Sequence, residues 1–312
     1  MKQTVKFSAL LLAFALTGSV LFSSCDKDDD PTPTPDPTIT DVVVSDPNFS
    51  ILEAAVIKAE LADDLAQPGA LTVFAPDNAA FTAAGITEAV VATLSKEVLV
   101  DILTYHVLGA KVTADMVPAS DAVTTLQGKS LFASKNANGV FVNGVKVTTA
   151  DVPATNGVIH VINGVLKPPT QSIAQIASAP GFSILLSAVI KAGLADAVSG
   201  PGKFTVFAPT NAAFEAAGLN QAAIDAASVE TVTAIVQQHV IGTTVYASDL
   251  INAATAPTIK AGATLTINTS PAGVKLTGSA NEFSNVVTTT PGATFNITAT
   301  NGVVHVIDKV IL

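Results

Sequence analysis

The hydrophobic and polar positions of this chain follow two periods, and they do so in the same order twice. Apolar residues recur every three or four positions over residues 49–59 and again over 182–192, which predicts an amphipathic helix in each segment. A turn and a short apolar run come next, at residues 71–75 and 204–208, and each run has the length of a buried strand. The pattern therefore predicts a helix–turn–strand unit that occurs twice.

Further helices are predicted after each of these strands. Asp77 and Thr210 directly follow the proline that ends each apolar run, and their side-chain oxygens suit the N-cap of a new helix. Another helix is expected over residues 96–105, with a counterpart at about 230–238. Each unit thus begins with helices and one strand.

The last third of each unit has a different pattern. It is rich in Thr, Val, Gly and Asn and contains stretches of period two, which is typical of strands joined by tight turns. Residues 131–147 and 264–276 are expected to form β-hairpins. Because helices come first and strands follow without regular alternation, we expect an α+β fold and not a doubly wound parallel sheet.

The repeat is visible in the residues themselves. The segment TVFAPDNAAF at residues 72–81 returns as TVFAPTNAAF at 205–214, which is 133 positions later. The segment NGVIHVI at 156–162 returns as NGVVHVI at 301–307, which is 145 positions later. The second copy therefore has about 12 additional residues between its two histidines.

A period of this length indicates two complete domains in tandem, since solenoid repeats run to about 20–50 residues. We assign residues 39–167 to the first copy and 171–312 to the second, and each is long enough for a core of its own. The residues between them, KPPT at 167–170, are expected to form a short, stiff joint.

The N-terminus has the plan of a secretory signal peptide, which we place at residues 1–24. Lys2 and Lys6 precede an apolar run over 7–22 that is short for a membrane span. Small residues then precede Cys25, which is the only cysteine of the chain. The stretch resembles a bacterial lipobox, which implies cleavage before Cys25 and lipidation of this residue, with palmitate as one expected acyl group. The alternative is ordinary cleavage nearby that leaves a free thiol.

Residues 25–38 are expected to form a tether. An acidic stretch at 26–30 is followed by alternating prolines at 31–37, which keep a backbone extended and prevent a helix. Fully extended, the tether would span roughly 40 Å at about 3.1 Å per residue. The acidic stretch resembles the export signal of surface-exposed lipoproteins in some Gram-negative bacteria. We therefore expect a lipoprotein on the extracellular face of the outer membrane, with the periplasmic face as the alternative and the membrane contacted only through the lipid.

Charge excludes one large class of partners. The chain has 25 acidic and 15 basic residues, a net charge of −10, and all of its basic residues are lysine. Phosphate backbones require clustered positive charge, and arginine is the usual residue for bidentate contacts. We expect no nucleic-acid partner.

The four histidines are the strongest candidates for chemistry, and all of them occur in repeated motifs: His106, His160, His239 and His305. The two near the C-terminal ends of the copies share one strand face with apolar neighbours, which favours hydrogen-bonded core residues. We expect the two histidines of each copy to form a structural polar pair. With no HExxH spacing, no GxSxG elbow and no carboxylate pair that recurs in both copies, we expect no metal, no cofactor and no catalytic residue.

Three ordered segments now identify the resemblance: TVFAP(D/T)NAAF, the Tyr105-His106 pair, and NGV(I/V)HVI, each present in both copies apart from that tyrosine. They resemble the marker segments of the fasciclin-like adhesion domain over residues 39–167 and 171–312. The resemblance implies a β-wedge or sandwich with helices packed on it, and a structural role for the motif residues, which include Asn78 and Asn211. The second copy departs from the pattern because Gln238 takes the place of the tyrosine.

The resemblance also implies work at a cell surface. It favours a non-catalytic adhesion and extracellular-matrix-binding module with protein or glycan partners, although the sequence does not indicate which residues bind. The alternative is a glycan-binding accessory lipoprotein of a polysaccharide-uptake system. The chain has no tryptophan and two tyrosines, Tyr105 and Tyr246, so it has few of the rings on which sugars usually stack.

Overall fold

The computed structural model describes residues 36–200, 202–250, 252–270, 273–278, 283–287 and 296–312. The described residues belong to one compact unit that begins at Asp36. The expected signal peptide, the expected lipidation site Cys25 and the tether up to residue 35 lie outside the described residues. Within the described residues, no helix has both the length and the apolar character needed to cross a membrane.

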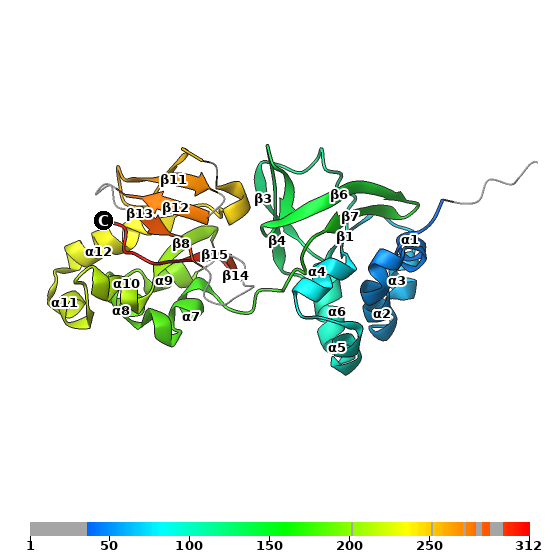
Figure 1. Ribbon diagram of the computed structural model, residues 1–312, viewed down its shortest axis with the longest axis horizontal. Coiled ribbons are helices and arrows are strands. Elements are labelled where there is room, and N and C mark those ends of the chain that lie inside the picture. Colours follow the sequence, from blue (N-terminus) through cyan, green and yellow to red (C-terminus); the bar gives the residue numbers. More distant parts are fainter. Residues whose placement is uncertain (1–35, 201, 251, 271–272, 279–282, 288–295) are drawn as a thin grey trace, which may run out of the picture. The chain divides into compact units, whose positions relative to one another are not determined.

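The first copy begins with helices and continues with a sheet, as predicted (Figure 1). Its helices are α1 (Ile39–Ser45), η1 (Pro47–Phe49), α2 (Ser50–Lys58), α3 (Ala62–Ala66), α4 (Asn78–Ala83), α5 (Glu88–Thr93) and α6 (Lys96–Tyr105). Its strands are β1 (Leu71–Pro76), β2 (Val107–Leu108), β3 (Ser120–Thr124), β4 (Ser130–Asn136), β5 (Gly139–Val142), β6 (Val145–Ala154) and β7 (Gly157–Ile162).

The seven strands of the first copy form one sheet in the order β2-β1-β7-β6-β5-β4-β3. The early strand β1 is parallel to the last strand β7, with Phe74 opposite His160, and the other pairs are antiparallel. This parallel pair brings together the two repeated segments, although they are more than 80 residues apart.

The second copy repeats this plan. Its helices are α7 (Ile173–Ala177), η2 (Pro180–Phe182), α8 (Ser183–Lys191), α9 (Ala195–Ser199), α10 (Asn211–Ala216), α11 (Gln221–Ala226), α12 (Val229–Gln238) and η3 (Ala247–Asp249). Its strands are β8 (Phe204–Pro209), β9 (Val240–Ile241), β10 (Thr255–Pro257), β11 (Thr264–Ser270), β12 (Gly273–Thr277), β13 (Phe283–Asn285), β14 (Ile297–Ala299) and β15 (Gly302–Ile307).

The copies differ where the second has its additional residues. In the first copy, β6 is one strand that pairs with both β5 and β7. In the second, β13 pairs with β12 while β14 pairs with β15, so the strands of the described residues form two four-stranded sheets, β10-β11-β12-β13 and β14-β15-β8-β9. The bridge between Val286 and Ile307 connects these sheets. Within the described residues, the pairings that β6 makes in the first copy are thus divided between β13 and β14 in the second.

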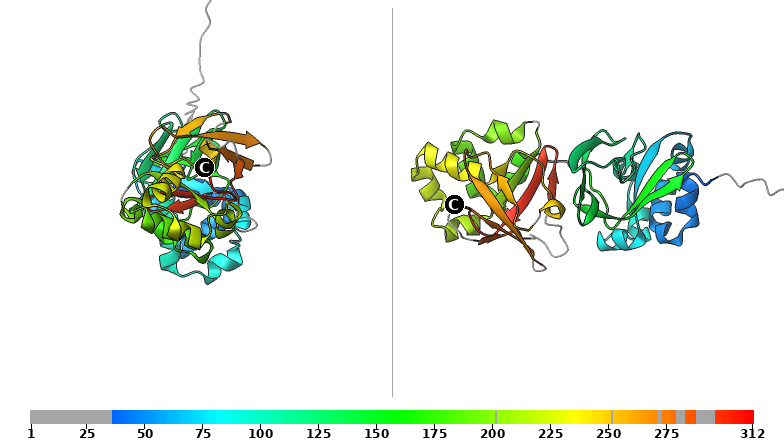
Figure 2. Two further views of the ribbon diagram at one scale, coloured as in Figure 1. Left: turned by 90° about the vertical axis from the view of Figure 1, so that its left-hand side faces the viewer. Right: turned by 90° about the horizontal axis from the view of Figure 1, so that it is seen from above.

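Each copy has two apolar clusters, one between helices and sheet and one among the strands. Strand β1 contributes to both clusters of the first copy, because successive side chains point to opposite faces. Val73 and Ala75 pack against the helices, whereas Phe74 packs among the strands. Figure 2 shows helices and strands grouped in this way within each copy. The predicted α+β fold is confirmed.

Side chains of the two copies also contact one another. The hydroxyl of Tyr246, a residue that is only 2% exposed, donates to Oδ1 of Asn143 at 3.3 Å. Its ring lies 5.9 Å from the ring of Phe132. The hydroxyl of Ser134 donates to the carboxylate of Asp249 at 2.6 Å. The contact is thus polar and aromatic.

Candidate functional site

The motif residue Asn78 joins the start of α4 to the start of α2. Its Oδ1 accepts from the amide of Ile51 at 3.1 Å, and its Nδ2 donates to the carbonyl of Pro47 at 2.9 Å and to the hydroxyl of Ser50 at 3.1 Å. Asn211 makes the equivalent three bonds, to Ile184, Pro180 and Ser183. Both side chains therefore satisfy backbone groups at a helix start that would otherwise lack partners.

His106 follows α6 and is buried, with 3% of its surface exposed. Its Nε2 accepts from the amide of Leu166 at 3.0 Å, so the proton is on Nδ1, which donates to the carbonyl of Ile102 at 2.8 Å. Burial lowers the pKa of His106 to about 4. His239 repeats these bonds with Ile311 and Ile235, and burial lowers its pKa to about 4 as well. Both rings are neutral near pH 7.

His160 lies on β7 and contacts a different part of the chain. Its Nε2 donates to the carbonyl of Val112 at 2.8 Å, and its Nδ1 accepts from the amide of Asp151 at 3.2 Å. Its ring stacks on Phe74 with centroids 5.5 Å apart. His305 shows the same stacking on Phe207, at 5.4 Å, and a bond of 2.8 Å from its Nε2 to the carbonyl of Val245.

The expected polar pair of histidines is therefore wrong. His106 and His160 each bond to backbone groups of separate segments, Leu166 after β7 and Val112 after β2, and not to each other. The physical reason is that both nitrogens of each ring are hydrogen-bonded to backbone groups, so neither ring has a nitrogen left for the other histidine. Among the described residues, no group of three or more His, Cys, Asp or Glu side chains could hold a metal ion.

Tyr105 and Gln238 occupy equivalent positions but have different surroundings. The hydroxyl of Tyr105 donates to the carbonyl of Ser130 at 3.0 Å and accepts from Nδ2 of Asn143 at 2.8 Å. Burial raises the pKa of Tyr105 to about 12. Gln238 is only 1% exposed, and neither its Oε1 nor its Nε2 has a hydrogen-bond partner in the described part of the chain. Within the described residues, the second copy therefore contains a buried amide without a hydrogen-bond partner.

One pair of structural residues was missed by sequence reasoning, although it starts a repeated motif. Asn156 accepts from the amide of Ile39 at 3.0 Å and donates to the carbonyls of Leu65 and Gln67 at 2.7 and 2.9 Å. Asn301 does the same for Ile173, Val198 and Gly200. The following glycine is required because a Cβ on Gly157 would lie 2.1 Å from the carbonyl oxygen of Leu71. This Asn-Gly pair fixes α1 and α3 against the sheet.

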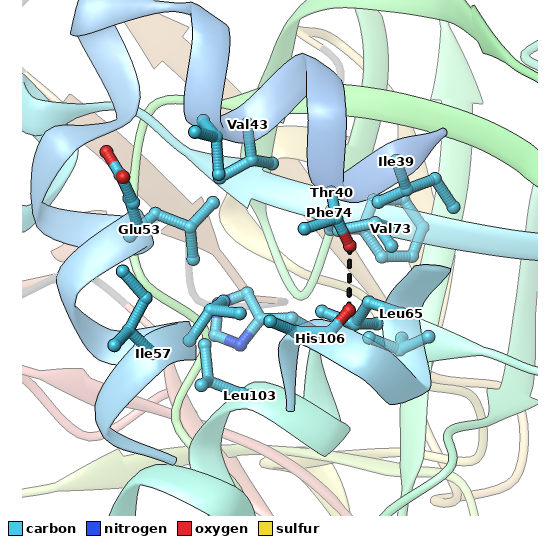
Figure 3. A pocket seen from close by; sticks show the side chains of 15 residues that line it. Ile39, Thr40, Val43, Glu53, Ile57, Leu65, Val73, Phe74, Leu103 and His106 are labelled. Carbon is cyan, nitrogen blue, oxygen red and sulfur yellow. Dashed lines mark hydrogen bonds between the residues drawn. The ribbon is translucent and has the colours of Figure 1, made fainter. Parts of the chain in front are cut away.

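A small apolar pocket lies beneath the helices that Asn156 fixes (Figure 3). It has a volume of about 30 Å³ and is enclosed by α1, α2, α3, β1 and the end of α6. The side chains of Ile39, Val43, Val56, Leu65, Val73 and Leu103 line it. The hydroxyl of Thr40 donates to the carbonyl of Ala62 at 3.0 Å and so connects α1 to α3 at its edge.

The second copy has an equivalent pocket of about 30 Å³. Its lining is Ile173, Leu185, Val189, Val198, Val206 and Val236. The second helix of each copy ends beside an exposed isoleucine, since Ile57 is 59% exposed and Ile190 is 60% exposed, but only Ile57 is among the residues that line its pocket. The edges differ, because Glu53 borders the first pocket and Leu186 borders the second. This pocket and its edge are the candidate binding surface of each copy.

Comparison with known proteins agrees with the repeat. The fasciclin domain model matches residues 47–168 and 180–312. The chain is 45% identical over 134 residues to protein sll1483 of Synechocystis sp., which covers 42% of this chain and 74% of that protein. It is 30% identical over 261 residues to the transforming growth factor-beta-induced protein ig-h3 of Sus scrofa, which covers 81% of this chain.

The chain spans only 36% of the length of ig-h3. Among solved structures, the FAS1 domain pair of the insect cell adhesion molecule fasciclin I is similar at 20% identity and a TM-score of 0.42, over 84% of this chain and 95% of that chain. The family model covers most of both copies, and the two copies share their helices, their parallel strand pair and their buried motif residues. The chain belongs to the fasciclin domain family and contains two tandem fasciclin domains.

Proposed function

We propose that the protein is a non-catalytic adhesion module that binds extracellular protein or matrix partners through its two fasciclin domains. Membership of the family supports this proposal, and so do the relatives, which include ig-h3 and, at 32% identity over 173 residues, stabilin-2 of Rattus norvegicus. That match covers 49% of this chain and 12% of stabilin-2.

The observation that carries the non-catalytic part of the proposal is the bonding of the motif histidines. The ring nitrogens of His106, His160 and His239 are bonded to backbone groups, and the Nε2 of His305 is bonded to a carbonyl. A general base must reach the proton it removes. Rings whose two nitrogens are committed to the backbone in a buried site support the fold instead.

The anchor is a second part of the proposal. Lipidation of Cys25, followed by an acidic, proline-rich tether, would hold both domains at the extracellular face of the outer membrane. Labelling of the full chain with radioactive palmitate tests this directly. The label should appear on the wild-type chain and be lost with Cys25→Ala, whereas equal labelling of both chains would contradict the anchor.

Binding of the purified chain to arrays of extracellular proteins and of glycans tests the adhesion proposal. We expect saturable binding to at least one protein, and binding to glycans alone would favour the accessory role in polysaccharide uptake. The surface gives that alternative less support, because Phe283 is the only aromatic residue among the exposed large hydrophobic residues of the described chain. Sugar-binding faces usually present several rings.

A further inference from the structure

The first copy has an apolar surface that is only partly present in the second copy. Val44 and Ile57 are 52% and 59% exposed, and both border the pocket beneath α1 and α2. In Figure 3, Ile57 and Val43 lie on either side of the pocket, and Glu53 extends beside them. We call the surface formed by α1, α2 and α3 around this pocket the α1–α3 face. Exposed aliphatic side chains over a pocket are typical of a surface that contacts a partner.

The segment that forms the α1–α3 face is more acidic than the equivalent segment of the second copy. Residues 39–66 contain six carboxylates and one lysine, whereas residues 173–199 contain one carboxylate and one lysine. The difference therefore lies in the carboxylates. The six in the first copy are Asp41, Asp46, Glu53, Glu60, Asp63 and Asp64, and the one in the second is Asp196.

Most of this negative charge is not neutralised within the domain. The ammonium group of Lys58 donates to the carbonyls of Val91 and Ala92 and so is already bonded. Lys96 pairs with Glu60, but none of the ion pairs found among the described residues includes Glu53 or the two aspartates of α3. Glu53 is half-buried at the edge of the pocket. A positively charged side chain of a partner would be attracted to the carboxylate of Glu53.

This charge pattern decides between the possible occupants. The acidic tether of the same chain and a second copy of this chain, with its net charge of −10, would both be repelled. The carboxylates do not converge on a metal position within the described residues. A basic segment remains, and the apolar pocket requires that it carry an aliphatic side chain.

We propose that the α1–α3 face of the first copy binds a lysine- or arginine-rich segment of an extracellular protein, with one aliphatic side chain of that segment packed on Ile57 and Val44 over the pocket. This inference rests on the proposed adhesion function and specifies which face serves it. The second copy, which has Leu186 in place of Glu53, is expected to bind such a segment weakly.

The test uses the full chain and three fluorescent pentapeptides, KKLKK, KKSKK and EELEE, with anisotropy as the readout. We expect KKLKK to bind at least fivefold more tightly than KKSKK, and EELEE to show no binding. Because charges attract the peptide, raising the salt concentration should weaken the binding of KKLKK. Equal binding of KKLKK and KKSKK, or no binding of KKLKK, would overturn the proposal.

Two variants and one control locate the site. Ile57→Ser should weaken KKLKK at least fivefold, and the triple change Glu53→Gln, Asp63→Asn and Asp64→Asn should weaken it at least tenfold and reduce its salt dependence. The matched control in the second copy, Ile190→Ser, should leave affinity unchanged. These side chains are exposed or partly exposed, so circular dichroism should show intact folding. An equal loss with the control would overturn the assignment of the face.

The same variants separate this inference from the adhesion proposal. If the wild-type chain binds no extracellular protein on the arrays, the proposed function fails. If it does bind one and Ile57→Ser binds that protein equally well, the adhesion function stands and only the assignment of the α1–α3 face fails.

Discussion

We predict that a substitution of the buried Gln238 stabilises the chain, whereas most core substitutions destabilise a protein. Gln238 is 1% exposed at the end of α12, and both of its polar side-chain atoms lack a partner within the described residues. Its counterpart Tyr105 has two hydrogen bonds in an equally buried position. Burial of an amide without a partner costs about 1–3 kcal/mol in proteins.

Methionine has nearly the length of glutamine and no strong hydrogen-bonding group. Gln238→Met removes the cost of the buried amide and keeps the packing, so we expect it to stabilise the chain by about 1–3 kcal/mol. The matched change in the first copy has the opposite sign. Tyr105→Phe leaves Nδ2 of Asn143 and the carbonyl of Ser130 without this hydroxyl, so we expect a loss of about 1–3 kcal/mol.

Urea unfolding followed by far-UV circular dichroism measures both free energies in a chain that has no tryptophan. Amide hydrogen exchange assigns each change to its copy, since the stability of exchange-protected strands reports the copy that contains them. A loss of more than about 1 kcal/mol in Gln238→Met would refute the reasoning, because an amide that stabilises the chain cannot be unpaired.

Three further predictions concern the other buried polar groups. Burial holds the pKa of His106 and His239 at about 4, whereas an unfolded histidine titrates near 6.5, so the unfolded chain binds more protons between these pH values. Lowering the pH from 7 to 5 should therefore reduce the free energy of unfolding, measured with urea, by about 2 kcal/mol per histidine. His106→Gln should make this free energy depend less on pH. An unchanged pH dependence would contradict the neutral buried ring. Asn156→Ala should lower the free energy of unfolding by about 1–3 kcal/mol and weaken KKLKK binding, because three backbone groups that position α1 and α3 lose their hydrogen bonds. Unaltered amide hydrogen exchange in both helices would contradict this. Tyr246→Phe should cost about 1 kcal/mol by removing the hydroxyl that donates to Asn143, and a stabilised variant would show that this bond is unfavourable.

Sequence patterns predicted most helices and hairpins because these elements are determined by residues close to one another in the sequence. The helix expected over residues 96–105 is α6 (Lys96–Tyr105), and the hairpins expected at 131–147 and 264–276 are present as β4–β6 and β11–β12. Asp77 caps α4 as predicted, accepting from the amide of Ala80 at 2.7 Å. A helical period, a capping side chain and a tight turn each act within a few residues, so they can be recognised without tertiary structure.

The candidate site could not be predicted in the same way, because its contacts join distant segments. Asn156 bonds to Leu65, which lies 91 residues earlier, and only the parallel pairing of β1 with β7 brings them together. The acid-rich composition of residues 39–66 is visible in the sequence, but their arrangement around a pocket depends on how α1, α2 and α3 pack. The unpaired amide of Gln238 was likewise visible only as a departure from Tyr105.

We propose, as the central point, that a lipid-anchored pair of fasciclin domains attaches cells to extracellular protein. Attachment of living cells under flow, to a surface coated with proteins secreted by the same organism, tests it most directly. Cells that produce the wild-type chain should remain attached, and cells with equal amounts of Cys25→Ala should detach like cells that lack the chain. Equal attachment of all three would contradict the account.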